Sequence, residues 1–228
     1  MSKPMLLADF VRLPPTVRGS VVEGLAAAID SVAERGAPSH RFLRFGWYAA
    51  ALAAYGGQAR TLVVEQDDVP VLTLPFVPLG PRVLRMAEIP GCCWPFRSFG
   101  VAFEASDAAL KTALSMLAGH VNGLRIGPVH DTDPAATALI VAARAKGWTA
   151  IDRTGTPGTR DGHPAFWEVV VADPVIAGMF RHSGDSGDGE GIGAAVDAPI
   201  RDWLLFRPGL PALAGRLFGW VWRRSATS

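Results

Sequence analysis

The sequence predicts a single α/β domain in which helices flank a mixed central sheet. Three observations indicate this class: helical periodicity comes first along the chain, a β-hairpin pattern follows, and helical and strand patterns then alternate. Of the 228 residues, 49% are hydrophobic and 19% are charged, which is typical of a folded protein with a normal core. We expect the domain to cover residues 1–175, followed by a linker over 176–198 and a tail over 199–228.

Two helices are expected before the first strand. Residues 20–35 repeat apolar side chains at helical spacing, and Gly36 follows as a stop signal. Residues 40–55 show a second, aromatic-rich helical pattern that ends at Gly56-Gly57. These aromatic side chains would suit an acyl pocket, but their spacing favours packing in the core.

A β-hairpin is expected next. Residues 61–65 and 69–77 are rich in β-branched and apolar side chains, and Asp67-Asp68 between them is typical of a turn. Further strands are expected over 82–89, 101–103, 124–129, 148–152 and 166–171.

Helices are expected between the later strands. Ser106 or Asp107 is a suitable cap for a helix over 108–121. Asp133 is a suitable cap for the next helix, whose first residue would be Pro134, because proline has no amide hydrogen to leave unpaired there. The alternation predicts crossover connections within one sheet.

Charge and cysteine content narrow the classes of partner. The formal net charge is +1, so we expect no nucleic-acid partner. Cys92 and Cys93 are adjacent and lie in no metal-ligand spacing, which favours packing over metal binding or a thiolate nucleophile and is consistent with a reduced cytoplasmic setting. We likewise expect no metal at His163 and His182, and the acids of residues 184–191 lack the ligand order of a calcium loop. No apolar run reaches the roughly 18 residues of a membrane span.

The last part of the chain changes in composition. Residues 182–198 are rich in Gly, Asp and Ser, which is typical of a flexible linker. Residues 199–224 place leucines and tryptophans at helical spacing with arginines between them, which predicts a short amphipathic helix. This tail could dock on the domain, on a partner protein, or on the inner membrane as a peripheral contact.

Two segments resemble a known family. FLRFGWYAAALAAYGGQARTLVVEQDDVPVLTLPF (42–76) resembles the opening of the CelD/BcsL-type acetyltransferases, and LRIGPVHDTDPAATALIVAARAKGW (124–148) resembles their strand–helix unit. The order of elements over 38–172 is similar to that of the GNAT acyltransferase fold. The resemblance implies N- or O-acylation with acetyl-CoA or another acyl-CoA, often linked to cell-envelope or exopolysaccharide synthesis. The family commonly has two GNAT-like halves, whereas the pattern here ends near residue 172.

The resemblance also implies a cofactor loop. Arg97-Ser-Phe-Gly100-Val-Ala102 matches the family motif of Arg or Gln, two residues, Gly, one residue, and Gly or Ala. In such a loop, backbone amides at a helix N-terminus bind the pyrophosphate of CoA, so Arg97, Gly100 and Ala102 are the expected cofactor-binding residues. The alternative is an ordinary loop that leads into a strand.

Two residues are candidates for proton transfer. Glu88 lies near the end of the expected strand 82–89, where related enzymes place a general base, and the alternative is a solvated glutamate. His130 follows the strand 124–129 at the edge of the sheet where α/β proteins bind ligands. The neighbouring Asp131 or Asp133 fits a helix cap more simply.

Two hypotheses for function follow. The first is an acyl-CoA-dependent transferase in which an amine or hydroxyl attacks the thioester directly. The second is a non-catalytic GNAT-like module that contacts a partner protein or a membrane-bound assembly through its tail.

Overall fold

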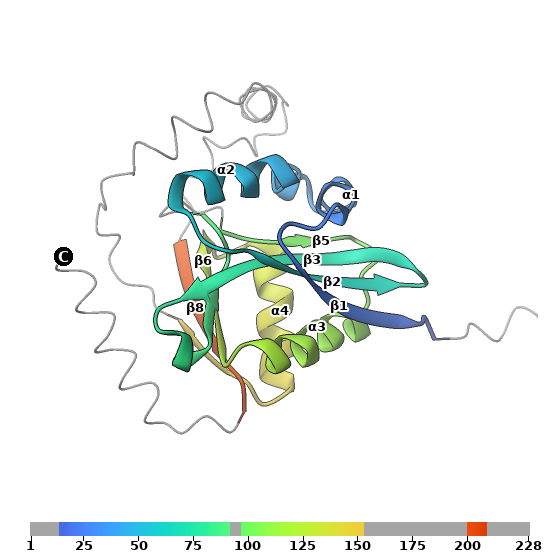
Figure 1. Cartoon of the computed structure of the whole chain (residues 1–228). Coiled ribbons are helices and arrows are strands. Elements are labelled where there is room, and N and C mark those ends of the chain that lie inside the picture. Colours follow the sequence, from blue (N-terminus) through green and yellow to red (C-terminus); the bar gives the residue numbers. More distant parts are fainter. Residues whose placement is uncertain (1–13, 92–96, 153–199, 209–228) are drawn as a thin grey trace, which may run out of the picture.

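The computed structural model describes residues 14–91, 97–152 and 200–208, which form a mixed sheet with helices on both faces (Figure 1). The helices are α1 (Ala28–Arg35), α2 (Phe45–Tyr55), α3 (Asp107–His120) and α4 (Pro134–Ala145), with short 3-10 turns η2 (Pro38–His40) and η3 (Arg82–Leu84). The strands are β1 (Val17–Glu23), β2 (Arg60–Gln66), β3 (Val69–Leu79), β4 (Met86–Glu88), β5 (Gly100–Val101), β6 (Gly123–His130), β7 (Thr149–Asp152) and β8 (Ile200–Phe206). The predicted α/β class is confirmed.

The eight strands follow the order β1-β2-β3-β4-β6-β8-β7, and β5 pairs with β3 beside this path. Neighbouring strands are antiparallel except β4 and β6, which are parallel. Helices α1 and α2 cover one face of the sheet, and α3 and α4 cover the other (Figure 1). The core contains fully buried side chains from all three layers, among them Ile29, Leu43, Tyr48, Leu62, Leu72, Leu74, Phe76, Ile89, Phe99, Leu114 and Leu117.

The prediction of a helix over 20–35 is wrong in its first half. Val17–Glu23 forms an edge strand, and the helix begins only at Ala28. Residues 17–23 pair antiparallel with β2, from Val17 opposite Gln66 to Glu23 opposite Arg60. Gly19, just before the expected helix, allows α3 to pack closely, because a Cβ there would lie 2.7 Å from Cγ of Met116. Pairing with a strand distant in sequence, which periodicity does not reveal, therefore decides the structure of this segment.

The predicted hairpin is confirmed. β2 and β3 pair around Asp67 and Asp68, whose φ angles are 53° and 63°. Two successive positive φ values make the turn whose twist matches that of the flanking strands, and aspartate tolerates this conformation better than most residues. The predicted strand 82–89 is wrong in its first half, because Arg82–Leu84 forms a 3-10 turn and only Met86–Glu88 pairs in the sheet.

The two predicted helix caps are confirmed. The side chain of Ser106 accepts a hydrogen bond from the amide of Ala109, and that of Asp133 accepts one from the amide of Ala136. Each cap pairs one of the amides that a helix leaves without an internal partner at its start.

The predicted boundary at residue 175 is corrected by strand β8. Ile200–Phe206, expected to belong to a separate tail, lies in the sheet between β6 and β7. Its Leu204, Leu205 and Phe206 are buried, so this run suits a strand inside a sheet. The expected strand 166–171, the linker 182–198 and the expected helical tail from residue 209 onward lie outside the described residues. In the described ranges, none of the helices has the length and apolar character needed to cross a bilayer.

Candidate functional site

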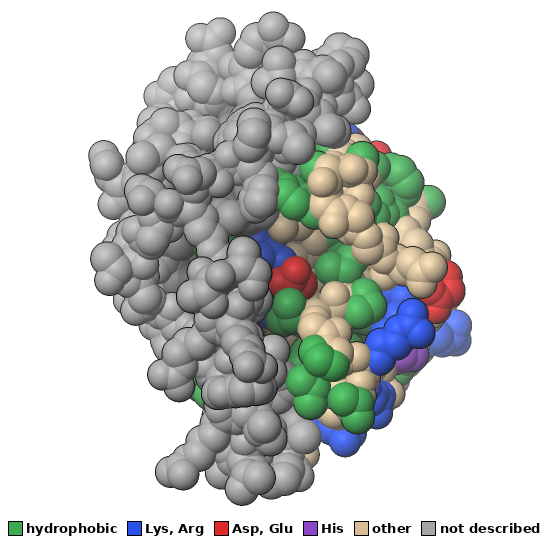
Figure 2. Space-filling model, turned by 60° about the vertical axis from the view of Figure 1, so that its left-hand side comes forward, with side chains coloured by type: hydrophobic (Ala, Val, Ile, Leu, Met, Phe, Trp, Pro, Cys, Tyr) green, Lys and Arg blue, Asp and Glu red, His purple; other side chains and the backbone are tan. Residues whose placement is uncertain are grey.

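A recess of about 150 Å³ lies where α2, β3 and β4 end close together. Glu88 supplies the carboxylate that lines it. The other lining residues are Ala51, Tyr55, Gly56, Gly57, Val77, Pro78, Pro90 and Gly91. Figure 2 shows an acidic and a basic side chain next to each other on one face of the molecule.

Two arginines hold the carboxylate of Glu88. Its Oε2 lies 2.8 Å from Nη2 of Arg97 and 3.4 Å from Nη1 of Arg125. The side chains of Glu88 and Arg97 are 20% and 7% exposed, so this is a largely buried ion pair. A ligand amine or proton that approached Glu88 would compete with both guanidinium groups for the same carboxylate.

Arg97 is held by more than its ion pair. Its Nε and Nη2 donate hydrogen bonds of 3.0 and 2.8 Å to the carbonyl oxygen of Ile89. Gly91 packs against the same side chain, since a Cβ at that glycine would lie 3.0 Å from Cγ of Arg97. Arg97 therefore stabilises the backbone at the end of β4.

The other two residues of the expected cofactor loop lie in the sheet. Gly100 pairs with Thr73, and the amide of Ala102 donates a 2.8 Å hydrogen bond to the carbonyl oxygen of Val71. A phosphate site needs several amides that point together at one anion. The Arg97–Ala102 segment therefore does not fit the pyrophosphate of CoA.

The N-terminus of α3 does not supply the missing site. Helix α3 begins at Asp107, after the cap Ser106, and the preceding Glu104 forms an ion pair with Arg35. The acids at 104 and 107 place negative charge where a phosphate would have to bind. The positive end of the helix dipole stabilises these two carboxylates, and their negative charge repels a further anion at the same place.

The contacts of Arg97 with Glu88 and Ile89 form because the chain leaves the sheet after β4 and returns to it at Gly100. Glu88 pairs with Val77 of β3 and Gly100 pairs with Thr73, so the chain between these pairings has eleven residues after β4, of which 92–96 lie outside the described residues, and only three (74–76) in β3. β4 and β6 pair over three positions only, and the amide of Arg97 then donates to Pro128 of β6. The returning segment therefore follows the course that a longer β4 would take.

A buried polar network lies beside this segment. Oδ1 of Asp133 accepts hydrogen bonds from Oγ of Ser98 (3.0 Å) and from the amide of Ala136 (2.7 Å), while Oδ2 lies 2.9 Å from Nε2 of His40. The hydroxyl of Tyr48 donates to the carbonyl oxygen of Ser98 at 2.8 Å. Ser98 and His40 both bind the carboxylate, so this is not the relay of a nucleophilic triad, in which the histidine binds the serine. Sequence reasoning found only the cap Asp133, because the other partners lie far away in sequence.

His130 lies at the end of β6 and lines a second cavity of about 180 Å³. Asp131, Ala136, Thr137, Ile140, Val141 and Arg144 complete its lining. Burial lowers the pKa of His130, and the nearby Asp133 and Asp131 oppose this effect. The two candidates for proton transfer thus line different cavities, and the structure does not bring His130 to the recess of Glu88.

The described residues contain no group of three His, Cys, Asp or Glu side chains that could hold a metal ion. Cys92, Cys93, His163 and His182 lie outside these residues, so their expected roles stay predictions. Comparisons of the chain with models of protein families, with curated proteins and with solved structures gave no match. Any functional conclusion therefore depends on the geometry of the chain and on the resemblance in its sequence.

Proposed function

We propose that the chain is a GNAT-like domain that serves as a non-catalytic binding module for a partner protein or a membrane-bound assembly. Two observations support the GNAT-like part: the sequence resemblance over 42–76 and 124–148, and a parallel β4–β6 pair whose ladder ends after three positions. Acyl transfer in that fold would require the two parallel strands to part beyond such a short ladder. Here the amide of Arg97 donates to the carbonyl oxygen of Pro128 on β6 beyond that point.

One observation carries the non-catalytic part. The residues that should bind the cofactor, Arg97, Gly100 and Ala102, are engaged by Glu88 and by strand β3. Their release would break a buried ion pair and hydrogen bonds of the sheet, each of which stabilises the folded chain. A CoA molecule would have to compensate for these losses before it gained any affinity.

Calorimetric titration of the purified chain with acetyl-CoA tests the proposal. We expect no saturable heat and no thermal shift at millimolar ligand, while a GNAT enzyme of known activity titrated in parallel serves as the positive control. Saturable binding with unit stoichiometry would overturn the non-catalytic role.

Acyl transfer is a second candidate function, and the position of Glu88 favours it. This side chain is the carboxylate of the recess, where it could accept a proton from an acceptor amine. Glu88→Gln keeps the shape of the side chain but removes its basicity. Loss of acetyl-CoA turnover in this variant, with turnover present in the native chain, would support transfer, whereas turnover in neither protein would argue against it.

A further inference from the structure

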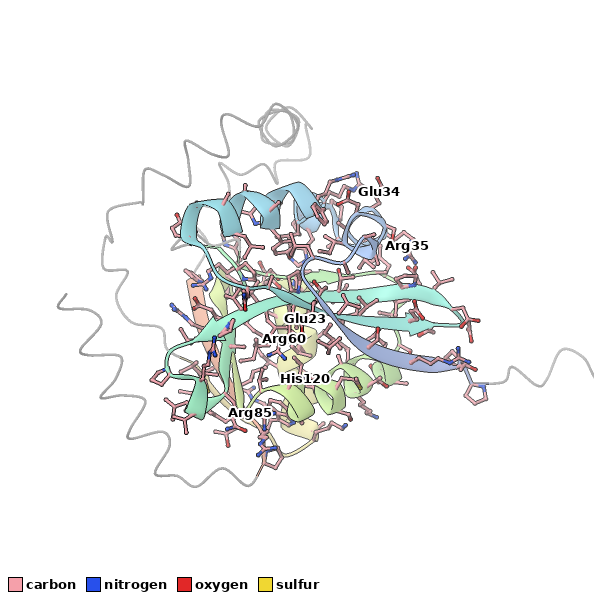
Figure 3. The ribbon with its side chains drawn as sticks, in the orientation of Figure 1. Glu23, Glu34, Arg35, Arg60, Arg85 and His120 are labelled. Carbon is pink, nitrogen blue, oxygen red and sulfur yellow. The ribbon has the colours of Figure 1, made fainter. Side chains whose placement is uncertain are left out.

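Three arginine side chains contact the C-terminal end of α3, and a fourth arginine lies close to one of them in sequence. Arg60, Arg82, Arg85 and Arg207, which we call the basic end, come from β2, from η3 and the residue after it, and from the residue after β8. The guanidinium of Arg207 donates to Ala118 O at 3.3 Å, and that of Arg85 donates to Gly119 O. Figure 3 shows Arg60 and Arg85 on either side of His120, and Nη1 of Arg60 lies 3.4 Å from Nδ1 of His120.

Several acids of the described residues lie far from the basic end. Glu65, Asp67 and Asp68 lie at the β2–β3 turn, and Glu104 and Asp107 lie at the start of α3, at the opposite end of that helix. The basic end has Glu23, which lies opposite Arg60 in the β1–β2 register. Two of these acids are paired, Asp68 with Arg18 and Glu104 with Arg35, whereas the basic end has, among the described residues, four arginines and one acid. Such an asymmetry orients a protein at a charged surface.

An exposed apolar side chain lies between two of these cations. Val83 is 82% exposed, with Arg82 before it and Arg85 shortly after it, both also exposed. The turn that carries Val83 is held in place, because Leu84 packs against the cluster of Met86, Leu204 and Phe206. An exposed valine beside arginines suits the boundary between lipid headgroups and acyl chains.

The chain also continues from this end. The amide of Arg207 donates to Asn122 O, which ties the last described residues to the loop after α3. The sequence that follows, GLPALAGRLFGWVWRR (209–224), combines leucine and tryptophan with arginine. Residues of this composition are frequent in segments that lie on a bilayer surface.

We propose that the basic end is a docking surface for an anionic phospholipid membrane. The arginines bind lipid phosphates, and Val83 contacts the apolar boundary beneath them. The low net charge and the exposed valine favour this partner over nucleic acid, which is bound by broad basic surfaces. The inference rests on the proposed binding role and specifies its partner. Titration with CoA tests whether the chain is non-catalytic, whereas the vesicle experiment tests whether the basic end binds a membrane.

The experiment is cosedimentation of the full chain with phosphatidylglycerol-containing vesicles and with neutral phosphatidylcholine vesicles. We expect binding to the anionic vesicles, weaker binding to the neutral ones, and release at high salt. Arg82→Glu combined with Val83→Asp should lower the apparent affinity at least about tenfold, since each arginine near an anionic surface contributes about 1 kcal/mol. Both side chains are exposed, so this variant should keep its native melting temperature.

Arg41→Glu combined with Phe103→Asp is the matched control. Both residues are exposed and lie away from the basic end, and the pair makes the same change in charge and apolarity. This control should bind vesicles as the native chain does. Equal binding by the native chain and the Arg82/Val83 variant, equal binding to neutral vesicles, or a preference for duplex nucleic acid would each overturn the proposal.

Discussion

Arg97 and Glu88, residues that would serve different steps in an acyltransferase, form an ion pair with Nη2 and Oε2 2.8 Å apart. From the sequence, Arg97 was expected in a cofactor loop, and Glu88 was expected to act as a general base toward the acceptor. In the structure they bind each other at the end of β4, beside the carbonyl oxygen of Ile89. The contact connects the end of β4 to Arg97, whose amide donates to the carbonyl oxygen of Pro128 on β6.

Arg97→Met should destabilise the domain by about 3–5 kcal/mol, because it leaves the carboxylate of Glu88 with a weaker set of partners in a largely buried position. Urea unfolding followed by circular dichroism measures the change. Arg41→Met removes an exposed arginine and should change the free energy of unfolding by no more than about 0.5 kcal/mol. Equal stability of the two variants would show that the ion pair does not stabilise the chain at the end of β4.

Asp133→Ala should destabilise the chain by about 3 kcal/mol, since it removes the cap of α4 and leaves Ser98 and His40 without their buried partner. Ser106→Ala removes only the cap of α3 and should reduce stability by about 1 kcal/mol. Thermal and urea unfolding of both variants give the comparison. Similar losses would mean that Asp133 acts as a cap alone.

Stability at high pH should depend on Tyr48. Burial raises the pKa of its hydroxyl, and the charge of Asp133 adds to the effect. Below a pH of about 10 the tyrosine is neutral in both the folded and the unfolded chain. Above that value the unfolded chain loses the proton while the folded chain keeps it, so the free energy of unfolding should fall as pH rises.

The variant Tyr48→Phe isolates this effect. It should reduce stability by about 1 kcal/mol at neutral pH, through loss of the hydrogen bond to Ser98 O. Above pH 10 its stability should decline less steeply than that of the native chain. Parallel curves of unfolding free energy against pH would contradict the assignment.

His130 should affect stability on the acidic side. Burial lowers its pKa from the ordinary value of 6.5, so the folded chain resists protonation that the unfolded chain accepts. Its contribution is present above pH 6.5 and is lost as pH falls through the lowered pKa. His130→Gln should therefore show a smaller decline in unfolding free energy between neutral and acidic pH. The same slope in both proteins would exclude His130 as the cause.

Local features were predictable from sequence because short-range chemistry decides them. The caps Ser106 and Asp133 and the Asp67-Asp68 turn depend on side chains that bind or accommodate the backbone beside them. Where a partner distant in sequence decides the local structure, the periodicity of apolar residues led to a wrong prediction. Residues 20–23 lie in a strand instead of the expected helix because they pair with β2, which is distant in sequence.

The sequence by itself determined the α/β class, the hairpin and the beginnings of α3 and α4, since these depend on periodicity and on neighbouring residues. Only the tertiary structure decided that residues 200–206 complete the sheet and that Arg97 forms an ion pair with Glu88. Both outcomes depend on buried contacts between residues distant in sequence: burial of apolar surface stabilises β8 in the sheet, and the attraction between the two charges offsets the cost of removing them from water. Cofactor binding by Arg97, Gly100 and Ala102 stays a prediction, while the fold uses these residues in contacts with Glu88 and β3.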